Sequence, residues 1–375
     1  MVSRRATLAL APWPQPIAPT ATMRAVVFDR FGGPDVLHVA DVVAVPAVGD
    51  DDIVVRVAAV SIGRLLDLNA RAGTHPFADF RFPHVLGAEH AGTVVSVGRH
   101  VDSPRVGEHV AVFPVVTCGG CTDCRNGHTE ACPRLEIIGV HRPGAYAEFA
   151  VSPAGNSHVV PDAIGPVDAA GLALAGPVAE NQLLAASVEA GDWVLVQGGG
   201  SSLGSLTASL AAHHQARVIA TSRSAAKREK LLELGVEAAL DPTAADFVAT
   251  VMRLTGGRGV DVAIDDLGEP EIWNKTMEVL ATRGTVVSSG AFLGKGGVHL
   301  NLMRLYLRSQ QIIGVRTGNA ASTELLWSQV EAGFHPIVDR SFPAAKAAEA
   351  HRYLESDQNM GRVVLTTATD ADWTA

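Results

Sequence analysis

The 375-residue sequence lacks the features that would direct it to nucleic acid or into a membrane. Its formal net charge is −9, and no run of lysine and arginine is long enough to form a basic patch. No apolar run approaches the roughly 18–20 residues that span a bilayer. The short apolar stretch near the N-terminus is broken at Pro12, so it does not match a signal peptide. A cytoplasmic location is therefore expected.

Cysteine and aromatic residues are also scarce. Only four cysteines occur, all between residues 118 and 132, which excludes a disulfide-rich scaffold. Aromatic residues make up 5% of the chain, against 47% hydrophobic residues and 37 glycines. A composition rich in valine, alanine and glycine is typical of an α/β protein with frequent tight turns. At roughly 100–200 residues per domain, the length suggests two domains.

Hydrophobic patterning divides the chain into two parts. Residues 1–22 contain four prolines and are predicted to be a disordered extension, so the first strand begins at Met23. Short valine-rich runs such as Ile53–Val57 then predict a small β-barrel domain. From Trp193 onward strands alternate with helices, which predicts a parallel, doubly wound sheet.

A glycine-rich stretch connects the strand at 193–196 to an Ala/Leu-rich helix. Glycines allow a backbone to turn tightly and approach a pyrophosphate, and the following helix N-terminus offers free N–H groups to phosphates. The alternative is a tight turn that binds nothing. The order of strand, turn, helix and next strand favours a dinucleotide site formed by Gly198, Gly200, Ser201, Ser202, Leu203 and Gly204.

The end of the second strand distinguishes between the two nicotinamide cofactors. NAD sites usually carry an acidic residue there, whereas this chain has Ser222 and Arg223, followed by Lys227. A hydroxyl and two cations suit a 2′-phosphate, which predicts NADPH; the alternative is a solvated helix start. Gly290, after a later strand, is predicted to let the nicotinamide end lie close to the backbone.

The four cysteines have metal-site spacing: Cys118, Cys121, Cys124 and Cys132. Four thiolates complete a tetrahedral shell around Zn²⁺ and leave no open position, so the predicted site is structural rather than catalytic. A disulfide pair or free thiols are the alternatives.

The chain from Met23 to about Thr366 resembles the medium-chain dehydrogenase/reductase superfamily, which includes zinc alcohol dehydrogenases and zinc-free quinone and enoyl reductases. Besides the glycine turn and the cysteines, the resemblance is carried by four segments: Phe31–Pro34, Gly87–Gly92, Gly144–Glu148 and Met360–Leu365. It implies a GroES-like catalytic domain at 23–172 and 318–368 with a zinc lobe at 115–135. It also implies a Rossmann domain at 173–317, a tail at 369–375, and homodimers or homotetramers.

The departures from the family pattern concern a second, catalytic zinc. The resemblance places the first ligand at Arg64, three residues before Asp67. It places the second at Ala88 and, by a looser alignment, the third at Leu174. None of these side chains is a good zinc ligand. A substitute site from His90 and Glu89 is the alternative, although open zinc sites use three protein ligands.

Without a Lewis acid, an alkene conjugated to a carbonyl is easier to reduce than a simple ketone. The sequence thus favours an NADPH-dependent reductase of activated C=C bonds or quinones. Arg64 is the candidate catalytic residue, stabilising an enolate, unless it pairs with Asp67 or another acid; Tyr146 is interpreted as packing. The alternatives are an alcohol or aldehyde dehydrogenase with an atypical metal site, and a cofactor-binding protein or non-redox biosynthetic enzyme on the same fold.

Overall fold

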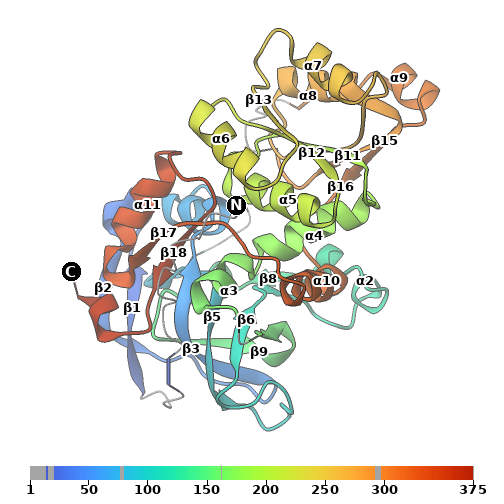
Figure 1. Cartoon of the computed structure of the whole chain (residues 1–375). Helices are drawn as coiled ribbons and strands as arrows, with labels where there is room; N and C mark the ends of the chain where they lie inside the picture. The colour runs from blue at the N-terminus through green and yellow to red at the C-terminus, as the bar shows by residue number, and fades with distance from the viewer. Residues whose placement is uncertain (1–13, 16–20, 77–79, 162, 292–296, 375) are drawn as a thin grey trace. The chain divides into compact units, whose positions relative to one another are not determined.

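The computed structural model describes residues 14–15, 21–76, 80–161, 163–291 and 297–374. Two compact units emerge (Figure 1). The first contains residues up to 124, residues 132–174 and residues from 338 onward, and the second contains 125–131 and 175–337. The predicted class, a β-barrel domain plus a parallel-sheet domain, is confirmed. Within the described ranges no helix is long and apolar enough to cross a bilayer.

The first unit is built around a strongly buried central strand, β3. Its Val54, Val57 and Val60 belong to one hydrophobic cluster, whereas Ile53 and Val55 belong to another, so both of its faces are covered. The main sheet has the order β10-β6-β5-β3-β18-β17, with β9 also on β3, and a smaller sheet has the order β2-β1-β4. The strands are β1 (Thr22–Phe28), β2 (His38–Ala44), β3 (Asp52–Ser61), β4 (His84–Val85), β5 (Glu89–Val97), β6 (His109–Val112), β7 (Val115–Val116), β8 (Glu136–Ile137), β9 (Phe149–Pro153), β10 (Ser157–Val159), β17 (Val338–Pro343) and β18 (Arg362–Thr366).

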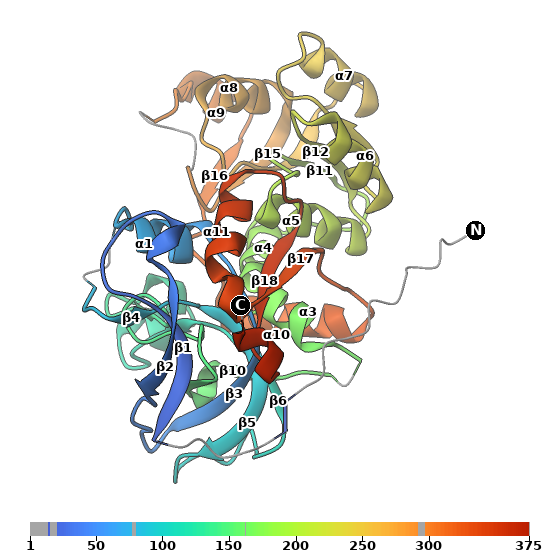
Figure 2. The same cartoon turned by 90° about the vertical axis from the view of Figure 1, so that its left-hand side faces the viewer.

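Short helices surround this sheet. Helix α3 packs against β3, β5 and β6, and α11 lies beside β17 and β18 (Figure 2). A π-helical turn at Arg64–Asn69 leads into α1. The helices are α1 (Ala70–Ala72), α2 (Thr122–Arg125), α3 (Pro166–Leu172) and α11 (Ala347–Glu355).

The second unit is a six-stranded sheet of the order β13-β12-β11-β14-β15-β16, in which every pair is parallel. Helices α7 and α8 cover one face through a cluster that includes Phe247, Val251, Trp273 and Met277, while α5 and α6 lie on the other face (Figure 1). The strands are β11 (Trp193–Val196), β12 (Arg217–Thr221), β13 (Ala238–Leu240), β14 (Val260–Ile264), β15 (Leu280–Ser288) and β16 (Gln311–Gly314). The helices are α4 (Ala175–Ala185), α5 (Ser202–His213), α6 (Ala225–Glu233), α7 (Phe247–Leu254), α8 (Pro270–Val279), α9 (Leu302–Leu307) and α10 (Ala320–Glu331).

The return to the first unit occurs later than predicted. The sequence-based boundary at residue 318 assigns α10 to the barrel domain, but α10 packs against α4 in the second unit, and the return begins at Val338. An amphipathic helix can be located from its periodicity, but the surface that it covers cannot.

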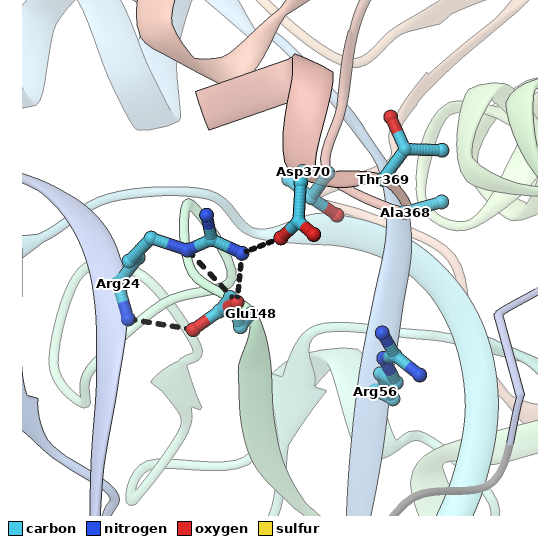
Figure 3. Close-up of a pocket in the computed structure, with 7 residues that line it drawn as sticks. Arg24, Arg56, Glu148, Ala368, Thr369 and Asp370 are labelled. Atoms are coloured by element: carbon cyan, nitrogen blue, oxygen red, sulfur yellow. Dashed lines mark hydrogen bonds and ion pairs between the residues drawn. The ribbon is translucent and has the colours of Figure 1, made fainter. Parts of the chain in front are cut away.

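The two predicted end segments are described only in part. Within the predicted tail, Trp373 is buried and its indole N–H donates to the carbonyl of Thr367. Figure 3 shows how Asp370 pairs with Arg24 of β1, which also holds Glu148. Most of residues 1–22 lie outside the described ranges. In the part of this segment that is described, the carbonyl of Gln15 accepts a hydrogen bond from Arg56 (3.0 Å).

Candidate functional site

The glycine-rich turn of the second unit has the compact form that a dinucleotide site requires. Gly198 adopts a positive φ of 69°, and Ser201 caps α5 by accepting a hydrogen bond from the N–H of Gly204 (3.0 Å). A Cβ on Gly204 would lie 2.3 Å from the carbonyl oxygen of Gly198, so no larger residue fits there. Ser202 and Leu203 form the first turn of α5, whose free N–H groups can meet a phosphate.

The predicted selectivity residues lie beside this turn. A Cβ on Gly200 would lie 2.7 Å from Ser222 Oγ and 3.0 Å from Lys227 Cδ, so both side chains rest against the glycine. Arg223 follows Ser222 and is exposed. The fold therefore brings Gly200, Ser222 and Lys227 together, with Arg223 adjacent in the chain.

Arg228 is a residue of this corner that the sequence interpretation missed. Its guanidinium donates to the carbonyls of Ser222 (2.7 Å) and Arg223 (3.0 Å), and it lies 3.5 Å from the carboxylate of Asp241. It thus holds the backbone that carries the two predicted phosphate-binding residues. In sequence it resembles an ordinary basic residue of a helix, and only its contacts reveal this role.

Gly290 follows β15, whose end is the carboxyl edge of the parallel sheet. The hydroxyl of Ser288 donates to the Gly290 carbonyl (2.7 Å), which fixes the local turn. Ala291 contacts Gly268 of the loop after β14, because a Cβ on Gly268 would lie 2.9 Å from the Ala291 Cβ. Gly290 therefore lies at the edge where dinucleotides bind in folds of this type.

The corner assigned to a catalytic zinc by resemblance is apolar. Ala88 belongs to a small hydrophobic cluster with Leu66 and Val140, and Leu174 packs against that cluster. Aliphatic side chains offer no lone pair to a metal ion.

Arg64 does not fill this corner. Its guanidinium donates to the carbonyl of Leu354 (2.6 Å) and forms a close ion pair with Asp357. This ion pair matches the alternative interpretation, with Asp357 rather than Asp67 as the acid, and the role of Arg64 towards an enolate stays a prediction. The residues lie far apart in the chain, so the sequence could not reveal the pairing.

Asp67 is instead held by backbone groups behind the corner. Its carboxylate accepts hydrogen bonds from the N–H groups of Gly63 (2.7 Å) and Gly87 (3.0 Å). Complete burial raises the pKa of Asp67 to about 7, although these two N–H donors oppose that rise. The side chain thus ties the turn before Arg64 to the segment that leads into Ala88.

A chain of hydrogen bonds starts at Arg71 and ends at Asp67, which accepts the last of them. Arg71 can only donate, so His351 Nδ1 accepts from it (3.1 Å) and His351 Nε2 carries the hydrogen. That N–H donates to the hydroxyl of Tyr146 (3.0 Å), and the hydroxyl hydrogen bonds to Asp67. Burial and the Arg71 charge lower the pKa of His351 to about 3, which keeps it neutral. Tyr146 is fully buried, in agreement with its interpretation as packing.

His90 and Glu89, the alternative metal ligands, each have a protein partner. His90 Nδ1 hydrogen bonds to the carbonyl of Ala88 (3.0 Å), and burial lowers the pKa of His90 to about 4. Glu89 forms a close ion pair with Arg362, which also donates to Ser61 Oγ (2.9 Å). The two side chains therefore have separate partners, which fits their alternation on a strand.

The four cysteines converge as their spacing predicts. The sulfur atoms of Cys118, Cys121, Cys124 and Cys132 all lie within 4.8 Å of one another, with 3.6 Å between Cys118 and Cys132. A tetrahedral Zn²⁺ with Zn–S bonds of about 2.3 Å requires sulfur atoms about 3.8 Å apart. The backbone N–H groups of Cys118 and Cys124 also point at cysteine sulfurs (3.5 and 3.4 Å), which favours thiolates. The donor set fits zinc.

Comparison with known proteins identifies the class. Residues 49–162 match the model of the alcohol dehydrogenase GroES-like domain, and residues 202–332 match that of zinc-binding dehydrogenases. The chain is 34% identical to L-galactonate-5-dehydrogenase of Escherichia coli K12, over 67% of this chain and 72% of the relative. It is 30% identical to 2-haloacrylate reductase of a Burkholderia species, over 91% and 98% of the two chains.

Solved structures agree with this grouping. A crystal structure of an NAD-dependent alcohol dehydrogenase matches with a TM-score of 0.83 and 34% identity, over 92% of this chain and all of that chain. A zinc-binding dehydrogenase from Sinorhizobium meliloti 1021 bound to NADP matches with a TM-score of 0.81 and 26% identity, over 93% and 100%. The chain belongs to the medium-chain dehydrogenase/reductase superfamily and is an oxidoreductase of that family.

Proposed function

We propose that this protein is an NADPH-dependent reductase without a catalytic zinc, acting on an activated C=C bond or a quinone. The observation that carries the proposal is the apolar corner of Leu66, Ala88, Val140 and Leu174, at the place where the family resemblance expects metal ligands. The similarity to a 2-haloacrylate reductase supports the C=C alternative, because that relative is named for an unsaturated substrate.

The second unit would hold the cofactor. The N-terminus of α5 and the glycine turn suit the pyrophosphate, and Ser222, Arg223 and Lys227 suit the 2′-phosphate. When bound, NADPH would supply the hydride for the β-carbon of the substrate and solvent would supply the proton for the α-carbon, which together would give the saturated carbonyl compound and NADP⁺. The chain's own part is to bind, orient and exclude water, and the apolar corner favours a substrate that its own carbonyl already polarises.

The cofactor preference can be tested by binding. We expect NADPH to bind the parent protein at least about 100-fold more tightly than NADH, because charge-assisted hydrogen bonds contribute about 1.5–3 kcal/mol each. Arg223→Ala should weaken NADPH binding about 10-fold and leave NADH binding unchanged. Dissociation constants from fluorescence titration provide the measurement, and Lys230→Ala, an exposed cation further along α6, is the matched control. Equal affinities for the two dinucleotides in the parent would end this assignment.

Turnover then tests the reaction class. A panel of enones, quinones, aldehydes and alcohols should show NADPH oxidation with the first two groups. Turnover confined to alcohols and aldehydes would favour the metal-dependent alternative. Tight NADPH binding without turnover across the panel would favour a cofactor-binding or non-redox role.

We also propose one structural Zn²⁺ per chain, held by Cys118, Cys121, Cys124 and Cys132. Because the four sulfurs would complete its coordination, this ion would brace the lobe and take no part in the reaction. Thiols available for a metal also suit a reducing location such as the cytoplasm.

We further propose that the chain forms a homodimer through α9 and β16. Helix α9 exposes Leu302 (66%), Tyr306 (67%) and Leu307 (66%), and β16 ends the sheet with no strand paired to its outer edge among the described residues. Edge strands of two copies can pair around a two-fold axis, which would cover this apolar surface.

In light scattering after size exclusion, the parent should be dimeric and the double variant Tyr306→Asp/Leu307→Lys should be largely monomeric. Leu232→Lys, at an exposed leucine of α6, should stay dimeric; a monomeric parent would refute the proposal.

A further inference from the structure

Asp266 occupies a distinctive place in the second unit. The strand order reverses direction between β11 and β14, and dinucleotides bind outside the carboxyl ends of strands at such a point. Asp266 lies just beyond the end of β14. Its neighbour Leu267 rests against Gly198 of the glycine turn, at 3.0 Å from the position of a Cβ there, and Gly268 contacts Ala291. The loop that carries Asp266 therefore links the phosphate-binding turn to the segment after β15.

The hydrogen bonds of Asp266 identify its charged form. One carboxylate oxygen accepts from the N–H of Ser289 (2.6 Å) and the other accepts from Gln182 Nε2 (2.7 Å). The Gln182 amide is itself oriented, because Nε2 also donates to Ser289 Oγ (2.9 Å) and Oε1 accepts from the hydroxyl of Thr207 (2.9 Å). Both oxygens of Asp266 therefore face donors, which favours the anion. Burial raises the pKa of Asp266, and these two donors oppose the rise.

No cation compensates this charge within the described part of the chain. The group next to Asp266 is another acid, Asp265, whose Oδ1 accepts from the N–H groups of Leu267 and Gly268. Its second oxygen, Oδ2, is buried and takes no hydrogen bond from a described residue. Two acidic side chains therefore lie next to each other just beyond the end of β14.

We propose that Asp266 is a positioning residue that stabilises the oxidised nicotinamide relative to the reduced one. The inference rests on the proposed function, since it assumes that a nicotinamide dinucleotide binds at this edge. The ring carries a positive charge when oxidised and is neutral when reduced, so a fixed carboxylate nearby lowers the free energy of the oxidised form alone. The same carboxylate holds the Ser289 N–H and thereby shapes the turn that contains Gly290.

The ratio of two dissociation constants tests this role without any turnover. Asp266→Asn keeps the size of the side chain and removes its charge. We expect Kd(NADP⁺)/Kd(NADPH) to rise about ten-fold in this variant, the scale for a unit charge acting over several ångströms in a partly solvated site. The measurement is calorimetric titration with each dinucleotide separately.

Ser289→Ala is the matched control, because it removes a hydroxyl from the same network and leaves the charge and the backbone N–H in place. Its ratio should equal that of the parent. If Asp266 has a purely structural role, Asp266→Asn will weaken the binding of both dinucleotides equally, and the unchanged ratio will overturn the inference. In that case NADPH binding and enone turnover by the parent would still support the proposed function. Failure of the parent to bind either dinucleotide would overturn the proposed function and the inference with it.

Discussion

Serine in place of Cys132 is expected to release the bound zinc ion and lower the free energy of unfolding by more than about 3 kcal/mol. Cys132 is the buried member of the quartet, and its sulfur lies 3.6 Å from that of Cys118. A serine hydroxyl is a poor zinc ligand at neutral pH, so the variant offers three thiolates instead of four. Because metal binding is coupled to folding of the surrounding chain, loss of the zinc ion should lower the free energy of unfolding. Elemental analysis of the purified protein and urea unfolding are the measurements.

Asp123→Asn is the appropriate control for this substitution. It changes a residue of the same loop, between two of the cysteines, without removing a thiolate. The parent and this control should each hold about one zinc ion per chain, and chelation should reproduce the effect of Cys132→Ser. Stoichiometric zinc in Cys132→Ser with an unchanged unfolding midpoint would contradict the structural role. Two tightly held ions in the parent would contradict the proposed metal-free reaction.

Alanine in place of Arg362 is expected to destabilise the first unit by about 3–5 kcal/mol. Arg362 and Glu89 form an ion pair in which both side chains are at least 95% buried, and Arg362 also donates to Ser61. Removal of the guanidinium leaves a carboxylate in the core without its cationic partner and empties the space beside β18. Breaking one side of such a pair costs far more than the pair itself contributes. Chemical unfolding, followed by circular dichroism, is the measurement.

The double variant Glu89→Gln/Arg362→Ala separates charge from packing. If the unpaired charge dominates, the neutral glutamine should recover about half of the lost stability or more, because the desolvated anion is gone. Exposed ion pairs provide the comparison, and Arg99→Ala, which breaks a surface pair with Asp50, should change stability by less than about 1 kcal/mol. Losses of equal size in Arg362→Ala and Arg99→Ala would refute the central role of burial.

The features that the sequence predicted well are local ones. The Cys118–Cys132 spacing indicates a tetrahedral donor set because the ligands lie within one loop, and the sulfurs do converge. The glycine turn is equally local, since strand, turn and helix follow one another and Gly204 has no space for a Cβ. Patterns of this kind need only the geometry of a short segment, and that geometry depends little on the rest of the chain.

Pairings between side chains that are far apart in the chain could not be predicted from the sequence. The acid nearest to Arg64 in the sequence is Asp67, yet its guanidinium pairs with Asp357. The carboxylate of Asp67 instead accepts hydrogen bonds from two backbone N–H groups. The domain return was misplaced for a related reason, because the partner of α10 is α4 rather than the barrel.

The sequence by itself determined the two domains, the cysteine cluster and the glycine-rich turn, because each depends on residue types at short spacing. Only the tertiary structure decided which buried polar groups are paired: Glu89 with Arg362, Tyr146 with His351, and Asp266 with hydrogen-bond donors but, among the described residues, with no cation. The physical reason is that a charge or hydrogen bond in the interior depends on whichever groups the fold brings within a few ångströms. Sequence separation says almost nothing about that distance.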